Sequence, residues 1–164
     1  MSTAVFPGSF DPVTKGHMDL IYRASKMFDA LVLGVLINSS KQPLLTLEER
    51  VKLLGEVTNK MPNVRVEAFE GLLVDFVNKC DADAIVRGLR SVVRGLRSAG
   101  DFEYELPLAQ ANYKLNGRAD TIFLATSPQY SYVSSSAVKE LMRYNADISD
   151  FVPMEALKYL NRDK

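Results

Sequence analysis

Residues 5–20 read V-F-P-G-S-F-D-P-V-T-K-G-H-M-D-L, and three patterns follow one another in this stretch. The short apolar run at residues 4–6 is typical of a strand. A turn-rich segment comes next, with Pro7, Gly8, Asp11 and Pro12. From Met18 onward, apolar residues recur on one face of a helix. Because the N–H groups of such a turn and of a helix N-terminus attract negative charge, the stretch predicts a site for a phosphate group.

His17, the only histidine of the chain, lies at the start of this predicted helix. We expect its ring to point to where a nucleotide phosphate lies. The alternative is an ordinary connection between a strand and a helix, with no chemical role for His17. The combination of Thr14-x-Gly16-His17 with residues 8–12 favours the first interpretation, because it resembles the T/H-x-G-H signature of the nucleotidyltransferase superfamily. That superfamily includes cytidylyltransferases and adenylyltransferases, so the signature leaves the reaction open.

The overall composition limits the classes of protein to which the chain can belong. Its 164 residues fit a single domain, residues 1–164, that can bury a core without disulfides. Lys plus Arg and Asp plus Glu both number 20, and this zero net charge argues against binding to nucleic acid or to a membrane surface. The single cysteine, Cys80, excludes an internal disulfide and a Cys-based zinc site. With no apolar run of transmembrane length and no signal peptide, we expect a soluble, cytoplasmic protein.

Strand-like and helical patterns alternate along the rest of the chain. Beyond residues 4–6, strands are predicted at residues 31–37, 63–68, 83–86 and 121–125. After the first helix, a second helix is predicted to begin at a Thr46–Glu49 capping box and to stop near Pro62. Further helices are predicted at residues 71–80, 101–115, 134–144 and 154–160. The alternation predicts an α/β protein with a doubly wound, five-stranded parallel sheet of Rossmann-like type. Ligands of such sheets bind beyond the carboxyl ends of the strands. We therefore expect one edge of the sheet to bring together residues 8–17, 39–41, 72–73, 87 onward and 128–136.

The segment V-R-G-L-R-S-V, which begins at Val86, is followed at once by V-R-G-L-R-S-A. The repeat places the guanidinium groups of Arg87, Arg90, Arg94 and Arg97 just past a predicted strand end. Arginines in that position can hold phosphate oxygens in a bidentate manner. The alternative is a solvated charged face, since the spacing of three, four and three also lies along one side of a helix. We interpret at least one copy as a phosphate-binding segment.

Taken together, the ordered motifs resemble those of the phosphopantetheine adenylyltransferase family over essentially the whole chain. The matching segments are P-G-S-F-D-P-V-T-K-G-H from Pro7, S-K-Q-P around Lys41, T-L-E-E-R from Thr46, E-G-L-L around Leu73, R-G-L-R from Arg87, D-F-E-Y-E from Asp101 and Y-S-Y-V-S-S-S from Tyr130. The resemblance implies a nucleotidyltransferase of coenzyme A biosynthesis that uses Mg²⁺. It would move the adenylyl group of ATP onto 4′-phosphopantetheine and give dephospho-coenzyme A and pyrophosphate. The resemblance also implies a homohexamer and leaves coenzyme A open as a further ligand.

The resemblance carries the functional residues of the family over by motif. His17 would be the catalytic residue, lying against the transferring phosphate. The acceptor, 4′-phosphopantetheine, would be bound by Ser9, Lys41, Leu73 and Arg87. ATP would be bound by Ser9, Phe10, His17, Gly88, Leu89, Arg90, Glu105, Tyr130, Ser131, Tyr132, Val133, Ser134, Ser135 and Ser136. No protein residue is assigned to a metal, and Ser9 stands where the family usually has Thr, which keeps the hydroxyl.

These residue types suit a direct in-line displacement. The acceptor is already a phosphate anion, so no strong base is needed to activate it. The remaining task is to bring two polyanions together and to neutralise the charge that grows on the α-phosphate oxygens. One histidine, one lysine, arginines and two helix N-termini are suited to that task. The sequence suggests no Ser–His–Asp or Cys–His pairing, as expected for a transfer without a covalent intermediate.

The repeat departs from the pattern of the family, which normally has one R-G-L-R and a short spacer before the D-F-E-Y-E helix. Here ten residues separate Arg90 from Asp101, so the second copy is a seven-residue insertion. Which copy serves ATP is ambiguous, because Arg87 is anchored to the strand whereas Arg97 keeps the spacing of the family to Glu105. We expect Arg87 and Arg90 to serve the site, because the sheet fixes the strand end most rigidly.

The insertion leaves other functions open. If the duplicated segment disrupts the ATP site, the protein binds nucleotide or phosphopantetheine with impaired turnover. The four arginines can instead form a patch for RNA or another polyanion, although few features suggest stacking platforms beside them. A further alternative is an adenylyl- or cytidylyltransferase with another acceptor. The set of Lys41, Leu73 and Arg87 argues against that alternative by resemblance.

Overall fold

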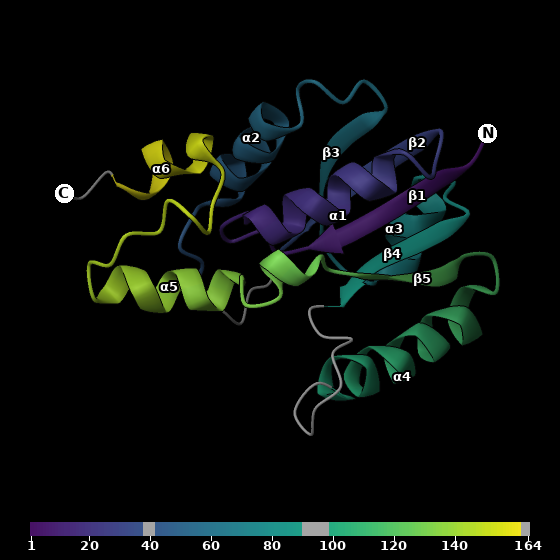
Figure 1. The fold of residues 1–164 in the computed structure, drawn as a ribbon. Coiled ribbons are helices and arrows are strands. Elements are labelled where there is room, and N and C mark those ends of the chain that lie inside the picture. The colour runs from purple at the N-terminus through teal and green to yellow at the C-terminus, as the bar shows by residue number, and fades with distance from the viewer. Residues whose placement is uncertain (38–41, 90–98, 162–164) are drawn as a thin grey trace.

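The computed structural model describes residues 1–37, 42–89 and 99–161, and its strands form one parallel sheet (Figure 1). The strands are β1 (Thr3–Gly8), β2 (Ala30–Leu36), β3 (Val64–Phe69), β4 (Ala84–Leu89) and β5 (Asp120–Ala125). Their order in the sheet is β3-β2-β1-β4-β5. The chain therefore starts at the centre, winds to one edge, returns to the centre and winds to the other edge. This topology confirms the predicted doubly wound, five-stranded parallel sheet.

Helices connect the strands and cover both faces of the sheet (Figure 1). They are α1 (Lys15–Ser25), α2 (Leu47–Val57), α3 (Leu73–Lys79), α4 (Ala99–Asn116), the 3-10 helix η1 (Pro128–Tyr130), α5 (Ser135–Arg143) and α6 (Met154–Leu160). In the described part of the chain, none of these helices is long and apolar enough to span a membrane.

The core has two apolar clusters, one on each face of the sheet. Ala4 and Phe6 of β1 belong to the cluster that α1, α2, α5 and α6 cover, whereas Val5 belongs to the cluster that α3 covers. Successive side chains of a strand point to opposite faces, so β1 is buried on both of them. This burial explains why β1 and β2 appear in the sequence as continuous apolar runs.

The two central strands separate before they reach their carboxyl ends. β1 pairs with β2 along its whole length, from Thr3 to Gly8. It pairs with β4 only where Ala4 meets Ala84 and Val5 meets Ile85. β1 and β4 are the strands at which the winding direction reverses, and a sheet of this type opens a crevice at that point.

Several element bounds differ from the predicted ones. Pro7 and Gly8, predicted in a turn, belong to β1 because the pairing with β2 continues through them. β4 likewise continues to Leu89, since its pairing with β5 extends that far. The predicted helix that starts at residue 71 begins instead at Leu73, because Gly71 has a φ of 96°, in the left-handed region. The helix predicted to stop near Pro62 is α2, and it ends at Val57.

Candidate active site

A cavity of about 760 Å³ opens beyond the carboxyl ends of the strands, where β1 and β4 separate. The turn after β1, the first turns of α1 and α5, β4 and one side of α4 contribute to its wall. The predicted site residues that line it are Ser9, Phe10, His17, Leu73, Arg87, Gly88, Glu105, Val133, Ser134, Ser135 and Ser136. The fold therefore brings most of the residues assigned by resemblance to a single cavity.

Four residues assigned to ATP lie outside the lining of this cavity. Leu89 is buried in β4, and Tyr130 ends the 3-10 helix η1. The Ser131 hydroxyl donates a hydrogen bond back into its own turn, to the carbonyl of Pro128 at 2.8 Å. Tyr132 is 62% exposed. The polar contribution of this segment to the cavity therefore comes from the residues after Tyr132.

Lys41 and Arg90 of the predicted site lie outside the described residues, and so do Arg94 and Arg97 of the second R-G-L-R copy. Which R-G-L-R copy serves ATP therefore stays a prediction. Arg87 belongs to the described strand β4 and lines the cavity, which supports the assignment of the first copy to the site.

His17 caps its own helix and faces the cavity. The Thr14 hydroxyl accepts the N–H of His17 at 3.3 Å, and Nδ1 of His17 accepts the N–H of Thr14 at 3.1 Å. This is the reciprocal pattern of a capping box, with an imidazole in place of the usual Glu or Gln. A backbone N–H can only donate, so Nδ1 carries a lone pair, and the proton of the neutral ring lies on Nε2. The ring therefore presents an N–H donor on the side opposite its helix cap.

Phe10 supports the imidazole from the turn after β1. Its side chain is 1% exposed, and the ring meets that of His17 edge-on with the centroids 5.2 Å apart. The backbone of Phe10 has a φ of 47°, in the left-handed region that is uncommon for residues other than glycine. The Phe10 ring also lies where a Cβ on Gly8 would approach it to 3.0 Å. The turn is thus shaped around a buried aromatic ring that holds His17 in place.

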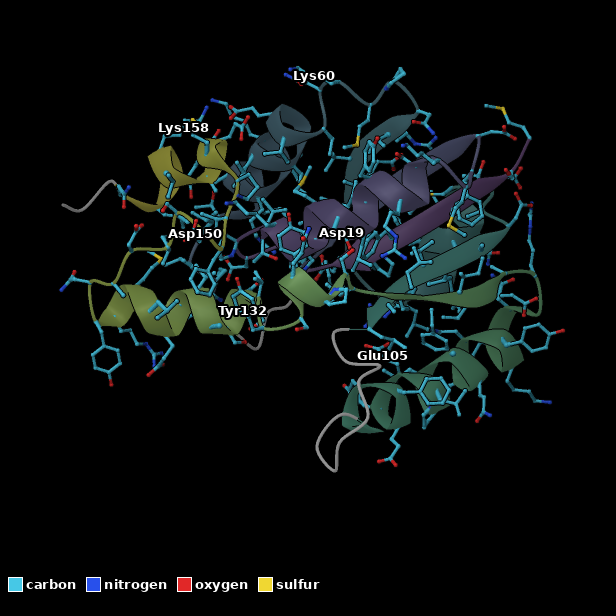
Figure 2. The ribbon with its side chains drawn as sticks, viewed as in Figure 1. Asp19, Lys60, Glu105, Tyr132, Asp150 and Lys158 are labelled. Atoms are coloured by element: carbon cyan, nitrogen blue, oxygen red, sulfur yellow. The ribbon has the colours of Figure 1, made fainter. Side chains whose placement is uncertain are left out.

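Arg87 and Glu105 form a bidentate ion pair at the cavity wall. The Arg87 Nε donates to one carboxylate oxygen at 2.8 Å, and its Nη2 donates to the other at 2.5 Å. Nη1 of Arg87 donates to the carbonyl of Pro7 at 3.3 Å, which ties the guanidinium to β1. Glu105 projects from the side of α4 that faces the sheet (Figure 2). Arg87, which the resemblance assigns to the acceptor, is therefore paired with Glu105, which the resemblance assigns to ATP.

The first turn of α5 forms the opposite wall. Ser134 is the N-cap, and its hydroxyl accepts the N–H of Ala137 at 3.0 Å. The Ser135 hydroxyl donates to the carbonyl of Pro12 at 2.8 Å, so it fixes the helix to the turn after β1. The attraction of this wall for an anion comes mainly from the helix dipole and from the first N–H groups of the helix, which have no carbonyl partner within the helix itself.

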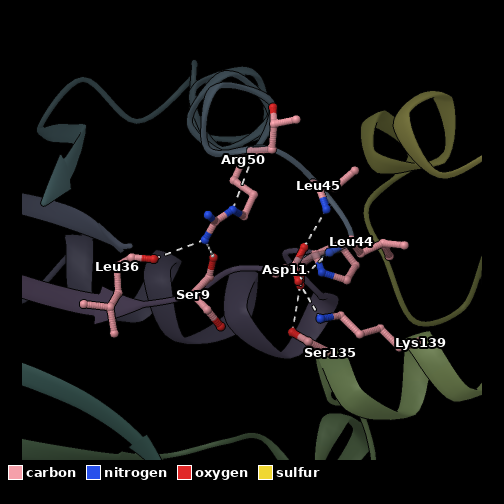
Figure 3. A network of polar contacts seen from close by, with 10 residues as sticks. Ser9, Asp11, Leu36, Leu44, Leu45, Arg50, Ser135 and Lys139 are labelled. Atoms are coloured by element: carbon pink, nitrogen blue, oxygen red, sulfur yellow. Dashed lines mark hydrogen bonds and ion pairs between the residues drawn. The ribbon is translucent and has the colours of Figure 1, made fainter. Parts of the chain in front are cut away.

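Sequence reasoning missed a network of buried charges at the floor of the cavity (Figure 3). Arg50 of α2 and Asp11 of the first turn are 6% and 4% exposed, and both line the cavity. The Lys139 ammonium of α5 lies 2.5 Å from a carboxylate oxygen of Asp11. A signal for Arg50 was present in the sequence, because it shares the inward face of its helix with Leu53 and Leu54.

Asp19 is a second missed residue, and it holds the start of the connection between β5 and α5. One of its carboxylate oxygens accepts the Ser127 hydroxyl at 2.8 Å, and the other accepts the Ser127 N–H at 3.1 Å. Figure 2 shows Asp19 on α1 beside this connection. Asp19 thus links the helix of His17 to the segment that leads into Ser134.

The described residues contain no group of three or more His, Cys, Asp or Glu side chains that could hold a metal ion. Asp11 and Glu105, which both line the cavity, are each engaged in an ion pair. Mg²⁺ is commonly bound through substrate phosphates and water with few protein ligands. The acidic side chains that line the cavity therefore suit a magnesium ion that binds together with a nucleotide better than a magnesium ion that is coordinated by protein side chains alone.

The chain matches the Cytidylyltransferase-like family over residues 5–141. It is also similar to bacterial proteins named phosphopantetheine adenylyltransferase. The protein from Lachnoclostridium phytofermentans is 53% identical over 160 residues, which cover 98% of this chain and 94% of that protein. The protein from Caldanaerobacter subterraneus subsp. tengcongensis is 50% identical over 153 residues, covering 93% of this chain and 91% of that one. A protein from Clostridium perfringens strain 13 is 48% identical, with coverages of 98% and 93%.

A solved structure from Vibrio parahaemolyticus, described as a nicotinate-nucleotide adenylyltransferase, has the same fold. It superposes with a TM-score of 0.69 and covers 99% of this chain and 100% of that one. The two sequences are 18% identical, so the likeness shows the fold alone. The fold is that of an α/β, Rossmann-like nucleotidyltransferase.

Proposed function

We infer that this chain, which belongs to the phosphopantetheine adenylyltransferase family, transfers the adenylyl group of ATP to 4′-phosphopantetheine in the cavity beyond β1 and β4. The products are dephospho-coenzyme A and pyrophosphate, in a step of coenzyme A biosynthesis. The observation that carries this inference is the convergence of His17, Arg87 and the first turn of α5 on that cavity. Each of them favours an anion, and the reaction joins two polyanions.

The reaction is a single displacement at phosphorus. A phosphate oxygen of the acceptor forms a bond to the α-phosphorus of ATP, and the bond from that phosphorus to the bridging oxygen breaks as pyrophosphate leaves. Since the nucleophile is already an anion, no side chain has to remove a proton from it. The Nε2–H of His17 is the donor we assign to the α-phosphate oxygens, on which charge grows in the transition state.

The ion pair of Arg87 suggests how the acceptor is bound. A carboxylate and a phosphate offer a guanidinium the same arrangement of two oxygen acceptors. We expect the acceptor phosphate to take the place of the Glu105 carboxylate on Arg87. Glu105 would then be released to accept a hydrogen bond from ATP, in agreement with the role that the resemblance assigns to it.

Magnesium is part of this proposal. The described residues offer no cage, so the ion would be held mainly by ATP phosphate oxygens and water. Bound in this way, Mg²⁺ neutralises phosphate charge. The residues of the chain bind and orient the two substrates.

Self-association is the further part of the proposal. The side chains of Tyr104, Leu108 and Leu115 on α4 are 69%, 44% and 65% exposed. An exposed apolar patch of this kind is typical of a protein interface, and the resemblance implies a homohexamer. We propose that copies of this chain, working in the cytoplasm, associate through α4. Because Tyr104 also lines the cavity, such an interface would lie beside the active site.

The test of the reaction is pyrophosphate release from ATP and 4′-phosphopantetheine, compared with a chain that lacks residues 93–99. We expect the full chain to release pyrophosphate only when both substrates are present. Equal activity of the shortened chain would identify the second R-G-L-R copy as a tolerated insertion. Activity in the shortened chain alone would overturn the proposal and favour a binding protein with impaired turnover.

A further inference from the structure

The ion pair of Arg87 with Glu105 closes one edge of the guanidinium to other anions. The side chain of Arg87 is 29% exposed, and that of Glu105 is 14% exposed. Glu105 covers the edge formed by Nε and Nη2, and each of these nitrogens donates to a different carboxylate oxygen. A phosphate that binds this edge in the same bidentate manner must therefore replace the carboxylate.

The guanidinium has a second anchor besides Glu105. Arg87 lies in the part of β4 that has separated from β1, since the last pair between these strands is Val5 with Ile85. Nη1 of Arg87 spans the gap and donates to the carbonyl of Pro7 at 3.3 Å. This contact does not involve Glu105, so it holds the guanidinium at the cavity wall when the carboxylate is replaced.

Glu105, in contrast, loses its counter-charge when Arg87 binds a phosphate. Within the described part of the chain, Arg87 is the one cation that pairs with Glu105. A largely buried carboxylate that has lost its partner and lies beside a phosphate of like charge is costly. The adenine amino group and the ribose hydroxyls of ATP are donors from which a carboxylate can accept. Bound ATP therefore lowers the cost of displacing Glu105 from Arg87.

We propose that Glu105 couples the binding of the two substrates. The acceptor phosphate takes Arg87 and releases Glu105 to the nucleoside of ATP, so each substrate raises the affinity of the chain for the other. By thermodynamic linkage, the factor is the same in both directions. This inference rests on the proposed function, which assigns Arg87 to the acceptor and Glu105 to ATP. While the acceptor is absent, the ion pair keeps both groups engaged and holds the affinity for ATP low.

The experiment measures the affinities of the parent chain by titration calorimetry in the presence of Mg²⁺. The nucleotide is α,β-methylene-ATP, which cannot release pyrophosphate because a methylene group replaces the bridging oxygen. We expect saturating 4′-phosphopantetheine to tighten the binding of this analogue about fivefold or more, as is typical of two coupled sites.

Glu105→Gln removes the charge and keeps an amide oxygen as an acceptor. We expect it to bind 4′-phosphopantetheine about threefold tighter or more, because no carboxylate competes for Arg87. The effect of the acceptor on the analogue should fall to less than about twofold. Glu105→Ala is the second variant and should show the same gain for the acceptor. Glu67→Gln is the matched control, since Glu67 on β3 forms ion pairs with Arg65 and Lys79 outside the cavity.

The outcomes separate the two proposals. If the parent binds the analogue equally well with and without the acceptor, or if the coupling persists in Glu105→Gln, the inference is overturned. A loss of acceptor affinity in Glu105→Gln would show that Glu105 merely holds Arg87 in position, and it would also overturn the inference. A parent chain that binds both substrates but releases no pyrophosphate from ATP would overturn the proposed reaction, while the affinities still decide the role of Glu105.

Discussion

The main-chain N–H of Thr14 donates to Nδ1 of His17 across 3.1 Å. This contact makes one ring serve two purposes, because it closes the cap of α1 and places the proton of the neutral ring on Nε2, in a side chain that lines the cavity. The orientation of the donor that we propose to be catalytic is therefore set by the same hydrogen bond that starts the helix. A variant that removes the ring should affect stability and catalysis for different reasons, and the two effects can be separated.

We expect His17→Ala to lower kcat by roughly 10²–10³-fold, as for loss of a transition-state donor, with ATP affinity largely retained. It should also reduce the free energy of unfolding by about 1 kcal/mol, because one half of the capping box is lost. His17→Glu restores the residue type that a capping box normally uses, so it should recover the stability and remain inactive. Kinetics and thermal unfolding measure the two effects. Normal turnover in His17→Ala would contradict the assignment of His17.

Arg87→Lys should raise the KM for 4′-phosphopantetheine about tenfold or more, because a lysine cannot hold two phosphate oxygens in the planar, bidentate geometry of a guanidinium. The KM for ATP should change less. Arg118→Lys is the control, since Arg118 pairs with Asp81 outside the cavity and should leave both KM values unaltered. If Arg87→Lys behaves like that control, another residue binds the acceptor phosphate.

Two glycines should respond to alanine in opposite directions. A Cβ at Gly88 in β4 would lie 2.3 Å from Cδ1 of the buried Leu20, so Gly88→Ala should destabilise the fold by about 1–3 kcal/mol. A Cβ at Gly55 within α2 would meet nothing inside 4 Å, so Gly55→Ala should stabilise by about 0.5–1 kcal/mol. Urea unfolding of both variants tests the pair. A tolerated Gly88→Ala would show that Leu20 can move aside.

The sequence was sufficient to predict the sheet and the edge at which the cavity lies, because these depend on local patterns. The Thr46–Glu49 capping box and the helix after Ser134 follow from side chains within one turn of each other. The parallel topology follows from the alternation of apolar strands with amphipathic helices. The caps join residues that are close in the sequence, and the topology follows from the order of locally recognisable elements.

The floor of the cavity was not predictable in this way, because its contacts join distant residues. Arg50 reaches Ser9, 41 residues away, and Asp11 reaches Lys139, 128 residues away. The helical pattern places Arg50 on the inward face of α2, but neither its main-chain partners nor those of Asp11 can be read from a local pattern, and charged residues are usually exposed. The bounds of β1 and β4 were missed for a related reason, since pairing with neighbouring strands extends β1 through Gly8 and β4 through Leu89, past the apolar runs that predicted them.

The exposed face of α4 should control the oligomeric state. Leu108→Asp combined with Leu115→Asp places charges among side chains that we propose to be buried between copies, so the variant should dissociate. Sedimentation velocity on the parent and the variant measures this. Met154→Asp is the control, because Met154 is 82% exposed on α6, away from α4. A parent chain that sediments as a monomer would contradict the proposal of self-association.

Glu56 links α2 to α6 and should make stability depend on acid pH. The Lys158 ammonium lies 2.6 Å from one of its carboxylate oxygens, and the Tyr159 hydroxyl donates to the other at 2.8 Å. Lys158 first and Tyr159 second lower the pKa of the Glu56 carboxyl below its ordinary value of 4.5. A carboxyl with a lowered pKa contributes stability that is fully present above its unfolded pKa and is lost as the pH falls through its folded pKa.

Glu56→Gln keeps an acceptor for Tyr159 and removes the charge, so it should be less stable than the parent at neutral pH. The difference in the free energy of unfolding should shrink as the pH falls below 4.5 and the parent loses the same charge. Urea unfolding at a series of pH values measures that difference. Glu140→Gln, at an exposed carboxylate of α5, is the control and should show a much smaller effect. If the difference in the free energy of unfolding between Glu56→Gln and the parent stayed constant with pH, the ion pair with Lys158 would contribute nothing to stability. Packing of α6 on α2 alone would then hold α6 in place.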